Sequence, residues 1–178
     1  RDGDSRPKRG RKRGVKEKSM SLLKDKKNET PSVLTWKKVY ESDLGNIVSE
    51  MKENVAIPSL IILSGEVGAG KTTFTKYFTE IKDVTSPTYA MIQDAGKTVH
   101  AYFYRLENAD EIIHLEIPLY LEEKDFFLVE WGREYFRVLD REVPDEFAFY
   151  ELTIEVNEAS STDDDRPSRN YVLKKLER

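Results

Sequence analysis

The chain has 178 residues, a formal net charge of −4 at pH 7 and no cysteine. This length suits one domain with a tail, and the absence of cysteine excludes disulfide bonds and zinc sites built from cysteine. No apolar run reaches the roughly 18 residues that a membrane helix needs, and no signal-peptide core follows the basic start, so we expect a cytoplasmic protein with no membrane segment.

Residues 1–28 differ sharply in charge from the rest of the chain. They hold 12 Lys and Arg against 4 Asp and Glu, whereas the remainder holds 17 against 29. Because this stretch also has few apolar residues, we expect a disordered basic extension over residues 1–31 and one folded domain over residues 32–178. The extension is either an RNA-binding arm or nuclear import signal, or a solvated leader translated or cloned upstream of a start near Met20; we favour the leader.

The domain begins with a predicted strand and helix. Residues 33–39 alternate in polarity, which predicts a strand at the edge of a sheet. Ser42 is the expected N-cap of the following helix. One face of that helix carries apolar residues at i, i+3, i+4 and i+7, namely Leu44, Ile47, Val48 and Met51. Pro58 then closes this unit.

The stretch from Gly65 to Thr72 fits the phosphate-binding loop pattern G-x-x-x-x-G-K-[ST]. It follows the apolar run 60–63, which predicts a buried strand, and precedes residues 73–78, which predict a helix. Glycines let backbone N–H groups face phosphate oxygens, and the helix N-terminus adds its positive dipole end. We expect Lys71 to reach the β- and γ-phosphates and the hydroxyl of Thr72 to bind magnesium. The alternative is a Gly-rich turn without a ligand, against which the flanking strand and helix argue.

Residues 83–89 are polar and are interrupted by Pro87. After a phosphate-binding loop, such a segment is the place of a mobile switch that carries a hydroxyl, here that of Ser86 or Thr88, toward the γ-phosphate and metal. Simple turn chemistry explains Ser-Pro-Thr equally well. The residues alone leave both interpretations open.

A hairpin and an amphipathic segment follow. Residues 89–93 and 98–103 predict two strands around a turn, which would make the sheet mixed. Residues 108–121 look helical, with Pro118 as an interruption. The core candidates of this segment are Ile112, Ile113, Leu115 and Ile117.

The second informative stretch is the apolar run 126–129, which ends in Glu130. A continuous apolar run is typical of a strand that is buried on both faces. An acid at the carboxyl end of such a strand lies where open α/β sheets bind ligands and where nucleotide hydrolases hold metal or polarise water. The alternative is a solvated strand end, and we favour function. Trp131 either packs in the core or walls a nucleotide pocket, and we lean toward a structural role.

The chain ends in two further predicted strands. Residues 147–156 alternate over a long stretch, and residues 170–174 are suited to pair with them. The acidic run between them, residues 160–165, reads as a solvated loop. The fold class that we predict is therefore α/β, a three-layer P-loop NTPase sandwich with a mixed, mainly parallel central sheet and antiparallel hairpin and edge strands.

Four motifs together resemble the TsaE family, the small bacterial ATPases of the tRNA threonylcarbamoyladenosine pathway. They are GEVGAGKTT at 65–73, SPTY at 86–89, His100 with Tyr-Arg-Leu at 104–106, and LVEW at 128–131. Each motif is loose alone, but four in this order and spacing are specific. The resemblance covers about residues 33–176, everything except the basic extension.

The resemblance implies an ATP-binding and ATP-hydrolysing subunit that works with two partners, TsaB and TsaD. TsaD transfers the threonylcarbamoyl group to adenosine, and the ATPase drives or resets that complex. The implied cofactors are ATP or ADP and Mg²⁺, with tRNA contacted indirectly or weakly.

Carried over by position, the resemblance also implies site residues. Catalytic roles fall to Lys71, Glu130 and Thr88, and the magnesium ligands are Thr72 and Glu130. The implied ATP contacts are Glu66, Val67, Gly68, Ala69, Gly70, Lys71, Thr72, Thr73 and Trp131.

Two positions depart from the family pattern. Tyr102 stands where the family has an aspartate that helps to hold magnesium, and a neutral phenol is a poorer magnesium ligand than a carboxylate. Glu116 stands where the family has a glycine.

The missing acid at Tyr102 favours a second hypothesis, a nucleotide-gated scaffold with little hydrolysis. A small-molecule kinase ranks lower, because it needs an acceptor-binding lid with basic residues, whereas residues 108–130 are mainly acidic and apolar.

Overall fold

The computed structural model describes residues 32–82, 92–158 and 167–178. The basic extension, the switch segment with Ser86 and Thr88, and the acidic loop at 160–165 lie outside these residues, so the predictions made for them stay predictions. Within the described ranges, no helix is long and apolar enough to cross a membrane.

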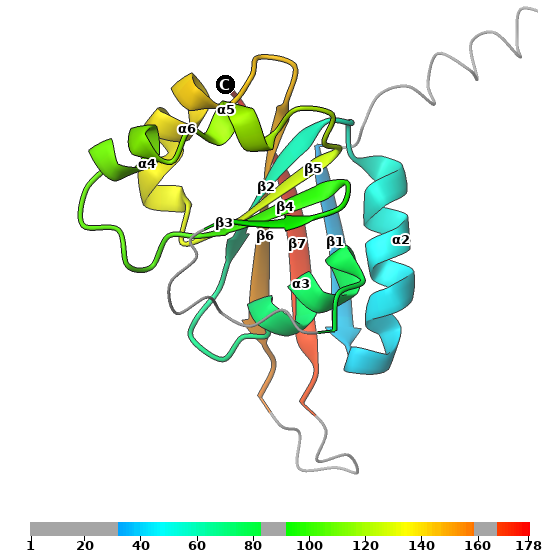
Figure 1. Ribbon diagram of the computed structural model, residues 1–178. Coiled ribbons are helices and arrows are strands. Elements are labelled where there is room, and N and C mark those ends of the chain that lie inside the picture. The colour runs from blue at the N-terminus through cyan, green and yellow to red at the C-terminus, as the bar shows by residue number, and fades with distance from the viewer. Residues whose placement is uncertain (1–31, 83–91, 159–166) are drawn as a thin grey trace, which may run out of the picture. The chain divides into compact units, whose positions relative to one another are not determined.

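The described residues form one seven-stranded sheet (Figure 1). Its order is β1-β7-β6-β2-β5-β4-β3, with β2 at the centre. The neighbours β6, β2, β5 and β4 run parallel, whereas β1, β7 and β3 pair antiparallel with their neighbours. The bounds are β1 Val33–Val39, β2 Ser59–Ser64, β3 Ile92–Ala95, β4 Thr98–Tyr102, β5 Phe126–Glu130, β6 Ala148–Val156 and β7 Arg169–Leu176. The predicted mixed, mainly parallel α/β sheet with β1 at an edge is confirmed.

Helices cover both faces of this sheet and complete the three layers. One face packs against α2 (Leu44–Asn54) and α3 (Lys71–Thr79). The other packs against α4 (Asp110–His114), α5 (Ile117–Tyr120) and α6 (Phe136–Glu142). Alternate residues of β2 and β5 enter the two cores, which explains why both strands read as continuous apolar runs.

The entry into α2 differs from the prediction. Ser42 is not the N-cap, because it lies inside a short 3-10 helix, η1 (Glu41–Asp43), and Asp43 precedes the first residue of α2. The Asp43 carboxylate instead accepts the backbone N–H of Tyr40 at 2.9 Å, which closes this extra turn. The predicted apolar face of α2 is confirmed, since all four of its residues are buried.

The segment 108–121 forms two short helices rather than one. The break lies at Glu116, whose φ of 54° is left-handed, and Pro118 lies in the first turn of α5, which begins at Ile117, instead of interrupting a helix. A left-handed residue favours glycine, which accounts physically for the glycine of the family pattern. Ile112 and Ile117 are buried, but Ile113 is 45% exposed, so its core assignment is wrong. Adjacent positions of a helix lie about 100° apart, and in α4 it is Ile112 that faces the core.

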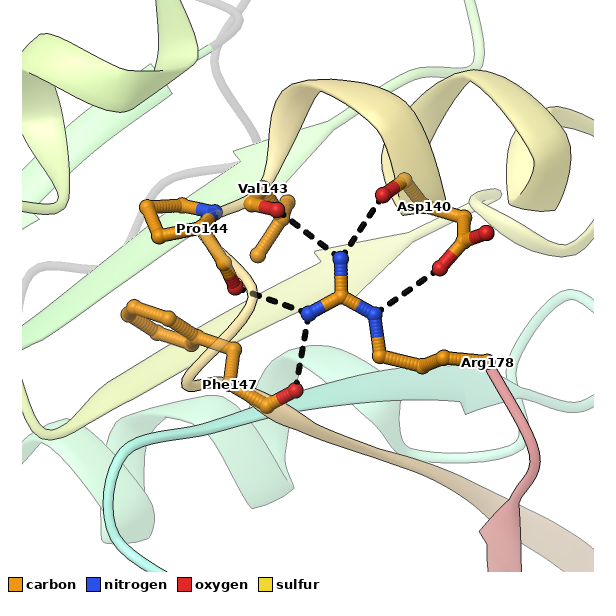
Figure 2. A network of polar contacts seen from close by, with 5 residues as sticks. All are labelled: Asp140, Val143, Pro144, Phe147 and Arg178. Atoms are coloured by element: carbon orange, nitrogen blue, oxygen red, sulfur yellow. Dashed lines mark hydrogen bonds and ion pairs between the residues drawn. The ribbon is translucent and has the colours of Figure 1, made fainter.

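Arg178 fixes the end of α6 and the start of β6 (Figure 2). Its guanidinium donates to the Asp140 carboxylate at 2.8 Å and lies 4.2 Å from the centroid of the Phe149 ring. It also donates, at 2.7–2.9 Å, to the backbone carbonyls of Asp140, Val143, Pro144 and Phe147. These bonds satisfy carbonyls that the end of a helix leaves free, and so they hold the segment that follows β5 against the sheet.

Candidate functional site

The predicted site residues that the structure describes lie beside the carboxyl ends of β2, β5 and β4. Leu63 and Tyr102 both pair with Glu130 in the sheet register, so the ends of the three strands lie side by side. The phosphate-binding loop leaves this edge directly after Ser64, and α3 begins at Lys71. This is the edge at which open α/β sheets bind ligands.

The loop has the backbone geometry that its glycines suggested. Gly68 and Gly70 have left-handed φ angles of 82° and 103°. A Cβ atom on Gly65 would lie 2.7 Å from the backbone oxygen of Ile154, too close for any other residue. The Ala69 N–H donates to the Glu66 carbonyl at 2.9 Å, which closes a turn within the loop. The loop is therefore a tight backbone cradle in front of the α3 N-terminus.

Arg169, the first residue of β7, holds the loop from the side. Its Nε donates to the Ala69 carbonyl at 2.6 Å. A Cβ atom on Gly70 would lie 3.0 Å from the same nitrogen, so the glycine also makes room for the arginine. A residue 100 positions away along the chain thus sets the position of the loop backbone.

Lys71 is only 9% exposed and points back along the loop. Its Nζ donates to the Gly65 carbonyl at 2.7 Å and lies 4.5 Å from the centroid of the Trp131 ring. Burial lowers the pKa of Lys71, and the negative charge of Glu130 opposes this effect. A poorly solvated ammonium that is held by one neutral carbonyl is well placed to exchange that carbonyl for an anionic oxygen.

Glu130 lies buried at the end of β5, with 2% of its surface exposed. Its Oε2 lies 2.7 Å from Nε2 of His100, which is also 2% exposed. The alternative of a solvated strand end is therefore wrong. Tyr102 is half-buried and lies beside Glu130 in the register, so an acid at position 102 would stand next to the Glu130 carboxylate.

Trp131 has a left-handed φ of 61°, which is unusual for a bulky residue and costs about 1–3 kcal/mol. Its ring lies 5.1 Å from that of Tyr104 and beneath Lys71. It lines an open cavity of about 460 Å³, together with Leu63, Ser64, Gly65, Lys71, Phe103, Tyr104, Leu106, Gly132, Arg133, Glu134 and Tyr135. Trp131 therefore both packs against the core and walls the cavity beside the loop.

The other predicted ATP contacts follow the loop. Glu66, Val67 and Gly68 are exposed at its tip, with Val67 at 85%, and Ala69 is buried beneath them. Thr72 and Thr73 are half-buried in the first turn of α3. Thr88 lies outside the described residues.

The donor atoms at this edge suit magnesium only in company with a nucleotide. No group of three or more His, Asp or Glu side chains able to hold a metal occurs in the described part of the chain. Glu130 and Thr72 supply a carboxylate and a hydroxyl, both hard oxygen donors. Magnesium keeps several waters and commonly takes one or two protein oxygens plus substrate phosphates, and these two side chains fit that demand.

Comparison with protein families identifies the family of this chain. The model of the family described as threonylcarbamoyl adenosine biosynthesis protein TsaE matches residues 39–166. The chain belongs to the TsaE family. The matched range contains the loop, His100, Glu130 and Trp131, and it ends before Arg169.

Three relatives carry the name tRNA threonylcarbamoyladenosine biosynthesis protein TsaE. That of Bacillus subtilis is 31% identical over 122 residues, which cover 64% of this chain and 73% of that protein. That of Streptomyces coelicolor is 38% identical over 84 residues, which cover 41% and 56%. That of Haemophilus influenzae is 31% identical over 83 residues, which cover 42% and 52%. The last two matches span only about half the length of these relatives.

The crystal structure of Bacillus subtilis YdiB has the same fold, with a TM-score of 0.51 at 23% identity. The match covers 82% of this chain and 86% of YdiB. Together with the sheet order, it confirms the P-loop NTPase-like fold that we expected of a TsaE protein.

Sequence reasoning missed two contacts of the site. His100 was noted only as part of a family motif, and its contact with Glu130 was not foreseen. Residues 100 and 102 of a strand share one face, and the parallel pairing of β4 with β5 in the structure brings that face to Glu130. The bond from Arg169 to the loop joins segments too far apart in the chain for any local pattern to reveal it.

Proposed function

We propose that this chain is the ATP-binding and ATP-hydrolysing subunit of the bacterial tRNA threonylcarbamoyladenosine machinery. It would act in the cytoplasm with a TsaD-like transferase and a TsaB-like partner and would contact tRNA indirectly or weakly. The single observation that carries the ATPase part is a buried carboxylate, that of Glu130, at the strand end beside the phosphate-binding loop and its lysine. Membership of the TsaE family supports the pathway.

The residues of the loop bind and orient the nucleotide in this proposal. The backbone N–H groups of the loop, other than that of Ala69, would face the phosphates of ATP or ADP. Lys71 leaves the Gly65 carbonyl and pairs with the β- and γ-phosphates, where it stabilises the charge that develops during transfer. Trp131, beneath Lys71, keeps water away from the ammonium.

Thr72 and Glu130 would hold Mg²⁺ together with the phosphates. The ion, when bound, neutralises charge on the β- and γ-phosphate oxygens. Glu130 also accepts a hydrogen bond from the attacking water and so orients it. The hydroxyl of Thr88, in the predicted switch, would face the γ-phosphate when ATP is present.

A reconstituted modification reaction tests the role in the pathway. The reaction contains TsaD-like and TsaB-like partners, tRNA and the threonylcarbamoyl donor. We expect that adding the chain and ATP raises the yield to about ten or more modified adenosines per transferase molecule, from about one in their absence. The yield is measured by digesting the tRNA and quantifying the modified nucleoside. An unchanged yield in the presence of the chain would contradict the proposal.

A second candidate function, a nucleotide-gated scaffold with little hydrolysis, is favoured by Tyr102. We expect Tyr102→Asp to raise magnesium-dependent ATP turnover about tenfold, because the new carboxylate would lie beside Glu130 in the register. Tyr102→Phe is the matched control and should leave turnover unchanged. Equal turnover in all three proteins would remove Tyr102 as a cause of weak hydrolysis and with it the support for the scaffold.

A further inference from the structure

His100 and Glu130 form a closed pair on neighbouring strands. His100 lies on β4, two residues before Tyr102, which pairs with Glu130 on β5. The two side chains therefore project from the same face of the sheet and meet diagonally, with 2.7 Å between His100 Nε2 and Glu130 Oε2. Both residues are about 2% exposed.

The pair leaves the two oxygens of Glu130 in different situations. Oε2 accepts a hydrogen bond from His100 Nε2, and within the described ranges no other side chain hydrogen-bonds the Glu130 carboxylate. No described side chain donates a hydrogen bond to Oε1. A single buried donor thus fixes the rotamer of the carboxylate and leaves Oε1 without a donor among the described side chains.

The other ring nitrogen of His100 has no such role. Nδ1 is buried and makes no hydrogen bond with any described residue. Burying a histidine ring costs free energy because its nitrogens lose their hydrogen bonds to water. Here one hydrogen bond, that from Nε2 to Glu130, offsets part of this cost. The contact with Glu130 is what the histidine provides at this position.

We propose that His100 is a positioning residue for Glu130. It holds Oε2 and thereby presents Oε1 to the magnesium ion and the attacking water of the ATPase. This inference rests on the proposed function and names a further residue of the same site. Because Tyr102 replaces the second acid, the orientation of this one carboxylate matters more than it would in a site with two.

A matched pair of amide variants tests the inference. His100→Gln places an amide nitrogen near the position of Nε2, whereas His100→Asn places it near Nδ1, short of Glu130. We expect His100→Asn to lower kcat by about 10- to 100-fold, the usual cost of losing a residue that orients a metal ligand. His100→Gln should stay within about threefold of the wild type, and ATP affinity should be unchanged in both. His100→Leu gives a third protein if the asparagine variant does not fold.

The affinity of the ADP complex for Mn²⁺, measured by electron paramagnetic resonance, supplies a readout that does not depend on turnover. We expect it to fall about tenfold in His100→Asn and to persist in His100→Gln. Equal Mn²⁺ affinity in both variants, or equal losses in both, would overturn the positioning role. If the wild-type protein shows no ATP turnover, the proposed function is contradicted. The Mn²⁺ affinities would still test the positioning role of His100, because they do not depend on turnover.

Discussion

Replacing Lys71 by alanine is expected to weaken ATP binding about 100-fold and to abolish hydrolysis. The ammonium is buried, its pKa is lowered by that burial, and the neutral Gly65 carbonyl accepts its hydrogen bond. Charge-assisted hydrogen bonds to phosphates in such a place are worth about 1.5–3 kcal/mol each, and 1.4 kcal/mol corresponds to tenfold in affinity. Titration of a fluorescent ATP analogue measures the loss.

Lys76→Ala is the control for this variant, because Lys76 lies exposed on the same helix. It removes the same charge from α3 and should leave ATP affinity within twofold of the wild type. If Lys71→Ala binds ATP as well as the wild type does, the loop at residues 65–72 is not the nucleotide site.

Glu130→Gln is expected to lower ATP turnover by about 100- to 1000-fold while ATP affinity changes little. The substitution keeps the size of the side chain but removes the charge that holds magnesium and orients water, and contributions of this kind have about that magnitude. Steady-state phosphate release, measured beside equilibrium ATP binding, separates the two effects.

Glu155→Gln serves as the matched control for this second variant. Glu155 is an exposed carboxylate on β6, outside the site. The ATP turnover of the Glu155→Gln protein should therefore equal that of the wild type. Turnover that survives in Glu130→Gln would show that the chemistry does not depend on the strand-end carboxylate.

The parts of the fold that local chemistry determines were predictable. The apolar runs of β2 and β5 require burial on both faces, and this requirement places them at the centre of a parallel sheet. The glycine spacing of the loop follows from the left-handed angles at Gly68 and Gly70. The placement of Glu130 at the carboxyl end of β5 therefore follows from the sequence alone.

What escaped prediction depends on backbone conformations and contacts that the polarity pattern does not encode. The left-handed conformation at Glu116 breaks a helix that its apolar pattern alone would continue. Ser42 does not cap α2 because it lies inside the 3-10 turn that the Asp43 carboxylate closes on the Tyr40 N–H. The partner of Glu130 depends on which strand lies beside β5, and this neighbour is known only once the sheet order is known.

The most direct test of the ATPase role is magnesium-dependent ATP hydrolysis by the purified chain, alone and with its TsaD-like and TsaB-like partners, with Glu130→Gln in parallel. We predict turnover that is present at least with the partners and is lost in the variant, because the Glu130 carboxylate manages magnesium and water at the strand end. Tight ATP binding without turnover in either setting would contradict a catalytic role and identify a nucleotide-gated scaffold.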